Sequence, residues 1–349
     1  MAKRSKLGSH IIPKFYLEQF AVRVQRRDKP GRIWVYEKNK KPDERATSVQ
    51  GVQNGYFGYI RDDGSVDGVL EAAFETDLAQ RENECDEVLF CSKSHLYHWP
   101  HGSREKLAFY AALLYSRATQ RSEHSAKNSR HTAEIFEKVL KEDKTLLSDV
   151  TASYSKRFSQ TFTEEEIRDL LLKSVLKSRG PGPEKNIFLA DLINNAELIA
   201  SLILEKPLWE VWQAVEGVEF ITSDNPLVSA VLLPHGKFHP GYGFRKKEII
   251  ALFPLAPTAC LAAGAFATGT KGIVGYRTVT AAMVNEINEA VISISDRYVY
   301  SKVLSDTVQK NVDMFGGSIR YGINALMPVG IQLPSVAEAA AALRKVCGC

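Results

Sequence analysis

Apolar residues recur at helical spacing through the middle of the chain. Leu70, Phe74 and Leu78 show this spacing, which places side chains three or four residues apart on one face of a helix. Thr163 and Glu166 have the spacing of a capping box, which marks the start of another helix. The pattern predicts helices over about 67–90, 103–124, 131–147, 163–178 and 184–204.

Strand patterns lie on both sides of this helical middle. Ile33 and Val35 alternate with Trp34 and Tyr36, and short β-branched runs follow in the C-terminal part of the chain. Gly217 predicts a hairpin turn between two of these runs. The predicted strands span 32–37, 56–60, 208–215, 218–222, 249–253, 258–263 and 297–301.

Three further helices are predicted over 10–20, 280–293 and 336–346. Together these elements predict an α+β fold, in which the helical middle packs on a mixed or antiparallel sheet built from N-terminal and C-terminal strands. A length of 349 residues is compatible with one domain or two. We expect a single domain over 1–330, helix-rich over 67–205 and strand-rich over 206–301, followed by a C-terminal helix and tail over 331–349.

The composition is typical of a globular protein, with 44% hydrophobic and 25% charged residues. We find no apolar run that approaches the roughly 20 residues needed to span a bilayer, so we expect no membrane segment. The first residues lack the apolar stretch of a secretory signal. Five scattered cysteines favour reduced thiols over a disulfide framework. These features predict a cytoplasmic protein.

Charge is unevenly distributed although the net charge is only +4. Residues 1–41 hold twelve Lys and Arg against three Asp and Glu, whereas residues 62–90 hold ten Asp and Glu against one Arg. These segments could be two solvated surfaces that neutralise each other. They could also form a face that steers phosphate towards a carboxylate cluster, so nucleic acid is a candidate partner.

Several motifs occur in an order that resembles the bacterial family known as domain of unknown function 4238. The motifs are His10-x-x-Pro13-x-Phe15-Tyr16-Leu17-x-x-Phe20-Ala21, Glu75-x-x-Leu78-Ala79-x-x-Glu82, Arg117 after an apolar helix, Phe220-Ile221-Thr222-Ser223-Asp224-Asn225-Pro226, Asn285, Asn288 and Tyr300-Ser301. The resemblance covers roughly residues 10–305, which favours a single domain. It departs from the family after Arg117, where Ala118-Thr119 stands in place of Thr-Pro. The resemblance indicates which positions matter but implies no reaction.

Asp224 is the first candidate for a functional site. It lies with Ser223 and Asn225 at the end of a β-rich run, a place where ligand sites are common, so Ser223 and Asn225 are candidates for substrate binding. The same residues equally suit a turn, since short polar side chains bond their own backbone and Pro226 restricts the backbone at the next position.

Carboxylates at helical spacing suggest a metal site. Glu71, Glu75 and Glu82 share one predicted helix face, and Glu75 and Glu82 together with Asp224 could bind Mg²⁺ or Mn²⁺ through oxygen ligands. Such an ion would activate water in phosphodiester hydrolysis. The alternative is a solvated helix face, which is the common environment of glutamates.

Arg117, His10 and Lys14 are candidates for contact with a phosphate. An arginine on the strongly apolar helix 103–124 needs a carboxylate or a phosphate as its partner. His10 could transfer a proton, because the ordinary pKa of histidine is near 6.5, or it could simply fix the entry into the first helix. Lys14 belongs to the basic N-terminal segment and is a candidate for substrate binding.

These residues predict a metal-dependent phosphodiesterase or nuclease, of the kind used in bacterial defence or as a toxin. The sequence has no P-loop, no G-x-G-x-x-G after a strand and no G-x-S-x-G motif, which disfavours ATP hydrolysis, nicotinamide chemistry and esterase activity. The competing hypothesis is a non-catalytic module that binds nucleic acid or a protein partner, with the same polar residues forming a structural ion-pair network. The oligomeric state has no signature in the sequence.

Overall fold

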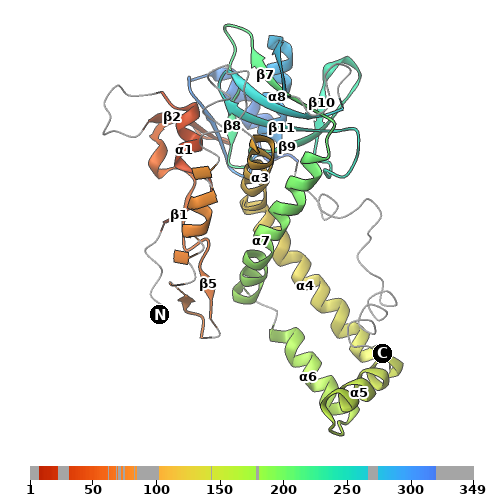
Figure 1. Cartoon of the computed structure of the whole chain (residues 1–349). Helices are drawn as coiled ribbons and strands as arrows, with labels where there is room; N and C mark the ends of the chain where they lie inside the picture. Colours follow the sequence, from red (N-terminus) through yellow and green to blue (C-terminus); the bar gives the residue numbers. More distant parts are fainter. Residues whose placement is uncertain are drawn as a thin grey trace.

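The computed structural model shows an α+β arrangement of helices and several sheets (Figure 1). It describes residues 8–22, 31–61, 63–67, 69, 72–73, 75–81, 83–84, 102–142, 144–177, 181–265 and 274–319. The predicted fold class is confirmed, because a helical middle segment packs with antiparallel and mixed sheets.

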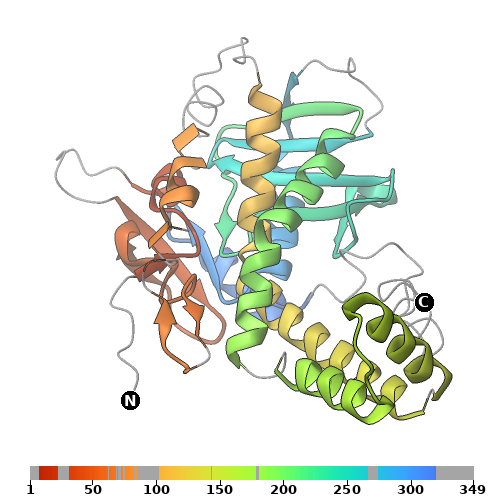
Figure 2. The same ribbon diagram turned by 60° about the horizontal axis from the view of Figure 1, so that its bottom comes forward.

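The largest sheet has six strands, all from the C-terminal part of the chain. In spatial order they are β10 (Phe238–Pro240), β9 (Val228–Leu232), β11 (Ile249–Ala256), β12 (Ala259–Gly264), β7 (Leu208–Ala214) and β13 (Val274–Val279). Neighbouring strands are antiparallel, except that β13 runs parallel to β7. Figure 2 shows α3 (Ser103–Ser116) and α7 (Pro181–Leu204) across one face of this sheet and α8 (Ala281–Ile294) on the other. The central strand β11 is therefore covered on both faces, which explains its unbroken run of buried residues.

A second sheet joins the N-terminal and C-terminal parts of the chain. Its four antiparallel strands are, in order, β3 (Asp43–Ala46), β2 (Arg32–Glu37), β14 (Tyr298–Ser301) and β8 (Thr222–Ser223). Two short antiparallel pairs lie in the N-terminal part, namely β1 (Gly8–His10) with β4 (Val52–Asn54) and β5 (Tyr59–Ile60) with β6 (Val66–Asp67). The second sheet matches the predicted pairing of N-terminal with C-terminal strands.

Several details of the strand prediction were wrong, and the strand predicted over 218–222 is reduced to Thr222–Ser223. The single sheet that was expected is two sheets, because β7 and β8 pair with different neighbours. Gly217, with φ +89°, therefore turns the chain from one sheet towards the other and makes no hairpin. The predicted strand 56–60 shortens to Tyr59–Ile60, because Tyr56 and Phe57 lie in a turn that buries both rings.

The helix predicted over 103–124 is two helices. The backbone leaves the helix at Arg117, which has φ −92° and ψ 1°, and a new helix begins at Thr119. No glycine or proline marks this break, and the apolar pattern of the first helix gives way to the polar residues of the second. The other helices are α1 (Lys14–Leu17), α4 (Thr119–Glu142), α5 (Lys144–Phe158), α6 (Glu164–Lys177) and α9 (Asp306–Phe315), with 3-10 turns at Glu18–Phe20, Thr47–Val49 and Pro234–Gly236.

Two hydrophobic clusters hold these elements together. The main cluster joins the N-terminal segment, α3, α7, α8 and both large sheets. The second cluster is small and lies in the arm formed by α4, α5 and α6, which extends away from the sheets in Figures 1 and 2. Its buried residues are Val139, Leu146, Leu147, Val150 and Ile167.

The capping box predicted at the start of α6 is present. The Thr163 backbone N–H donates to Glu166 Oε2 (2.8 Å), and the Glu166 N–H donates to Thr163 Oγ1 (3.2 Å). We expect Thr163→Ala to lower the free energy of unfolding by about 1 kcal/mol, measured by urea denaturation, because the Glu166 N–H loses its acceptor and the Glu166 carboxylate loses the hydroxyl donor. Thr161→Ala is the matched control at an exposed threonine two residues earlier. Equal stability of the two variants would contradict this role.

One helix is more apolar than the sequence pattern suggested. The segment Glu184–Leu204 of α7 is long and apolar enough to cross a membrane by length and composition alone, with a mean hydropathy of 1.7 in its most apolar window. In the structure Phe188, Leu192 and Ile199 of this helix belong to the main hydrophobic cluster. Core helices commonly share this composition, so the helix by itself gives weak evidence of a membrane segment.

Some predicted elements lie partly or wholly outside the described residues. Of the helix expected over 67–90, residues 75–81 are described and helical. Glu71 and Glu82 lie outside the described residues, as does the helix expected over 336–346.

Candidate functional site

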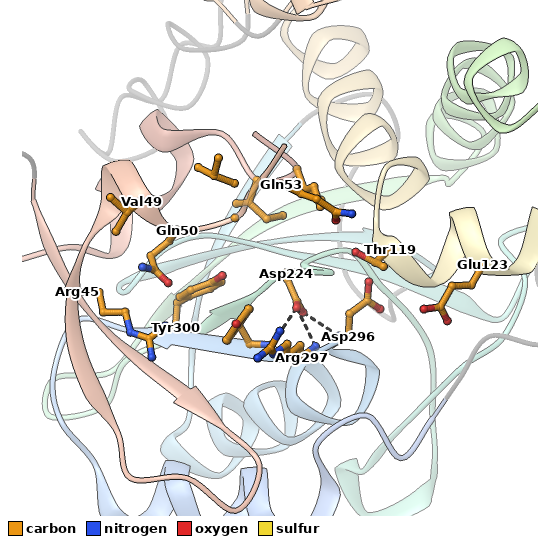
Figure 3. Close-up of a pocket in the computed structure, with 15 residues that line it drawn as sticks. Arg45, Val49, Gln50, Gln53, Thr119, Glu123, Asp224, Asp296, Arg297 and Tyr300 are labelled. Carbon is orange, nitrogen blue, oxygen red and sulfur yellow. Dashed lines mark hydrogen bonds between the residues drawn. The ribbon is translucent and has the colours of Figure 1, made fainter. Parts of the chain in front are cut away.

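The Asp224 carboxylate holds the loop that connects α8 to β14. Its Oδ1 accepts a hydrogen bond from the Asp296 backbone N–H (2.8 Å), and its Oδ2 accepts from those of Arg297 (2.8 Å) and Tyr298 (2.9 Å) (Figure 3). The Asp224 N–H in turn donates to the Tyr298 carbonyl (3.0 Å), which extends the pairing of β8 with β14. Asp224 is only 9% exposed. Three backbone donors satisfy its carboxylate, so its geometry is that of a structural clamp.

Burial and hydrogen bonding act in opposite directions on the ionisation of Asp224. Burial raises the pKa of its carboxyl group to about 6, while the three backbone N–H donors favour the carboxylate and oppose that rise. The side chain is therefore mostly ionised at neutral pH, the form that accepts all three hydrogen bonds.

The neighbouring polar residues of the motif also bind backbone groups. Ser223 Oγ accepts a hydrogen bond from the Asn225 N–H (3.2 Å), and its hydroxyl donates to the Asn225 carbonyl (3.0 Å), as the turn interpretation predicts. The Asn225 amide donates to the Ile294 carbonyl (3.0 Å) at the end of α8. Asn288 of α8 bonds the Ile221 N–H (3.0 Å) and the Glu219 carbonyl (2.9 Å). The motif thus links the short strand β8 to α8 and to the loop that follows it.

A pocket of about 320 Å³ gathers four of the residues predicted from the sequence. We call it the cationic pocket, and its lining is His10, Pro13, Lys14, Phe15, Glu75, Leu78, Ala79 and Arg117. Three separate segments supply the polar groups, since His10 and Lys14 flank the start of α1, Glu75 lies in the helical residues 75–81, and Arg117 lies between α3 and α4. Asp224, Ser223 and Asn225 do not line this pocket.

Arg117 is the most buried charged residue of the cationic pocket. It is 1% exposed, and its carbonyl accepts a hydrogen bond from the Tyr56 hydroxyl (2.9 Å). The break between α3 and α4 places it at the end of an apolar helix, where it faces the pocket. Lys14, by contrast, is exposed and lies at the pocket's rim.

The predicted metal site has no complete ligand set in the part of the chain that the structure describes. No group of three or more His, Cys, Asp or Glu side chains there could hold a metal ion. Asp224 already accepts three backbone hydrogen bonds and does not line the pocket that contains Glu75. Glu82 lies outside the described residues. Glu75 and Asp224 therefore line different pockets, and a Mg²⁺ or Mn²⁺ ion held by Glu75, Glu82 and Asp224 stays a prediction.

A second and larger pocket, of about 610 Å³, borders Asp224. We call it the polar cleft, and it is lined by Ile11, Ile12, Arg45, Val49, Gln50, Gly51, Val52, Gln53, Thr119, Glu123, Asp224, Asp296, Arg297, Tyr298 and Tyr300. Figure 3 shows it between the N-terminal segment, the start of α4 and the loop after α8. Of these residues, only Asp224 and, within a family motif, Tyr300 were singled out from the sequence. Residues such as Gln50 and Glu123 had no motif or periodicity to mark them.

Comparison with known families supports the resemblance seen in the sequence. A family model described as "Protein of unknown function (DUF4238)" matches residues 9–303, which confirms that resemblance. Comparisons with curated proteins and with solved structures find no match.

Proposed function

We propose that this chain, which belongs to the DUF4238 family, binds a phosphodiester of nucleic acid in the cationic pocket and hydrolyses it there. The observation that carries the proposal is the convergence of His10, Lys14, Glu75 and Arg117 on one pocket. These four residues come from three segments that are far apart in the sequence. Their types are those that phosphate binding and proton transfer require.

The charges of the pocket suit an anion. Among the described residues that line it, Lys14 and Arg117 contribute two cationic side chains against the carboxylate of Glu75. The guanidinium of Arg117 presents planar N–H groups that match two phosphate oxygens, and burial strengthens such an interaction by lowering the local dielectric constant. Lys14 at the rim would contact a neighbouring phosphate as a mobile point charge.

His10 supplies a group that can move a proton. In the proposed reaction a water oxygen forms a bond to phosphorus, the His10 imidazole accepts the proton of that water, and the bond to the leaving oxygen breaks. The leaving oxygen then takes that proton from the imidazolium, which returns the histidine to its starting form. The dependence of hydrolysis on Mg²⁺ or Mn²⁺ stays a prediction, and the proton transfers described above need side chains and water alone.

The test of this proposal is a hydrolysis assay with labelled single-stranded RNA and DNA, run with chelator, with Mg²⁺ and with Mn²⁺. Cleavage in any of these conditions, reduced in His10→Ala, would support it. Cleavage in the presence of chelator would show that the side chains catalyse the reaction without a metal ion. No cleavage and no binding of either nucleic acid by the purified full-length chain would overturn it.

Lys14→Ala is expected to weaken nucleic-acid binding about equally for all sequences. It should also reduce the slope of log K against log salt concentration by about 0.7–0.9, the value for one lost phosphate contact. Fluorescence anisotropy at several salt concentrations measures both quantities. Lys247→Ala removes an exposed lysine that lines neither pocket and serves as the control. An unchanged salt slope in Lys14→Ala would exclude a phosphate contact at this position.

A second candidate function is binding without hydrolysis. It is favoured by the hydrogen bonds of Asp224, Ser223 and Asn225, which give these motif residues a structural role. The competing hypothesis expects Asp224 to take part in an ion-pair network. In the structure its carboxylate instead accepts hydrogen bonds from backbone amides. A protein that binds RNA or DNA with the predicted salt dependence but cleaves neither would fit this function, and a protein partner would then be sought.

A further inference from the structure

The polar cleft and the cationic pocket are neighbours that share two stretches of backbone. In residues 10–15, Ile11 and Ile12 line the cleft while His10 and Pro13 line the pocket. Between α3 and α4, Arg117 lines the pocket and Thr119 the cleft. Consecutive Cα atoms are about 3.8 Å apart, so the two sites are separated by one or two residues along both stretches.

The charges of the cleft differ from those of the pocket. Arg45 is paired with Asp43 (2.9 Å) and Arg297 with Glu37 (2.9 Å), so other carboxylates already compensate both arginines. The lining also holds three acidic residues of its own, namely Asp224, Glu123 and Asp296. This balance disfavours a phosphate and suits a neutral, polar part of a ligand.

The remaining lining has the character of a site for a flat heterocycle. Three side chains with exposed area offer apolar surface, namely Val49, Val52 and Tyr298, and the buried Ile11, Ile12 and Tyr300 lie behind it. The amides of Gln50 and Gln53 offer donors and acceptors together, which is the combination that reads the edge of a nucleobase. A volume of about 610 Å³ lies within the usual range for small-molecule sites.

The Tyr300 hydroxyl gives an independent sign that a ligand group completes the cleft. Tyr300 is 0% exposed, and its hydroxyl has no hydrogen-bond partner in the part of the chain that the structure describes. Figure 3 shows its side chain between Arg45 and Asp224, among the residues that line the cleft. A buried hydroxyl without a partner is costly, and a nitrogen or carbonyl group of a base would supply one.

We infer that the polar cleft receives a nucleobase of the nucleic acid whose phosphodiester lies in the cationic pocket, an inference that rests on the proposed function. The base must leave its stack to enter, so the substrate class is single-stranded or locally unpaired nucleic acid. Stacking on Tyr298 and hydrogen bonds to Gln50, Gln53 and Tyr300 hold it there.

The test compares ligands that carry a base with one that lacks it. Isothermal calorimetry of the full chain with the four common nucleoside 5′-monophosphates and with ribose 5-phosphate measures each affinity. At least one nucleotide is expected to bind about tenfold or more tightly than ribose 5-phosphate, as one stacked base contributes. Tyr300→Phe keeps the ring and removes only the hydroxyl, so it should reduce that difference about fivefold, as the loss of one hydrogen bond does, and leave ribose 5-phosphate binding unchanged. Tyr59→Phe, at a tyrosine that lines neither pocket, should behave as the wild type.

The outcomes separate this inference from the function on which it rests. If ribose 5-phosphate and oligonucleotides bind but no nucleotide binds more tightly than ribose 5-phosphate, the base site is wrong and the phosphate site stands. If Tyr300→Phe folds as the wild type and keeps the full advantage of the base, Gln50→Leu provides the second test, and an unchanged advantage there also overturns the assignment. If neither phosphate compounds nor oligonucleotides bind, both proposals fail.

Discussion

Asp224→Ala is expected to lower the free energy of unfolding by about 3–5 kcal/mol. The substitution leaves the backbone N–H groups of Asp296, Arg297 and Tyr298 without their acceptor in a partly buried loop. Each buried donor that loses its partner costs about 1–3 kcal/mol, and partial access of water to the cleft reduces the sum. The loop after α8 would lose the contact that sets its position against β8.

Asp224→Asn sharpens this prediction because it keeps the shape of the side chain. Its carbonyl oxygen can accept from Arg297 and Tyr298, but its NH₂ group then faces the Asp296 N–H, so two donors meet. We expect a loss of stability of about half that of Asp224→Ala. Urea denaturation at pH 7 measures both variants, with Asp169→Asn at an exposed aspartate of α6 as the control.

The outcome also bears on the metal hypothesis. A carboxylate that serves mainly to hold an ion repels its neighbours when the ion is removed, so its replacement would cost little or even stabilise the protein in chelator. If Asp224→Ala lost less than about 1 kcal/mol in chelator, the structural role would be refuted and the metal role would regain support.

His10→Ala is expected to lower the rate of nucleic-acid cleavage by about 10²- to 10⁴-fold, the usual contribution of a general acid or base. Binding should change much less, because Arg117 and Lys14 of the same pocket remain to contact phosphate. Single-turnover cleavage and anisotropy binding, measured on the same preparation, separate the two effects. The melting temperature of the variant establishes that it folds.

Two comparisons make the His10 prediction specific. His235→Ala, at an exposed histidine that lines neither pocket, should keep the wild-type rate. Added imidazole should restore part of the rate of His10→Ala if the side chain transfers a proton, since the small molecule can enter the space left by the ring. A variant that cleaves at more than half the wild-type rate would show that His10 is not catalytic.

The sequence by itself determined several helices and strands of this protein, because local patterns encode them, whereas elements such as β9, β13 and α9 were not predicted. Alternation in Arg32–Glu37 predicted β2, and the Thr163 and Glu166 pair predicted the start of α6, since each signal depends on residues within one turn or strand. The same local information placed α8 and β14 within one or two residues of their observed bounds. It also identified Asp224 as a residue of importance, but not the reason for that importance.

Only the tertiary structure decided which polar residues meet. The motif around Asp224 suits a ligand site and a backbone clamp equally well, and the choice depends on the loop Asp296–Tyr298, more than seventy residues later in the chain. The break at Arg117 separates two helices and leaves that arginine facing His10 and Glu75 across a pocket. Long-range pairings such as β14 with β2 and β8 have no local signal, because side chains are brought together there by packing of the whole core.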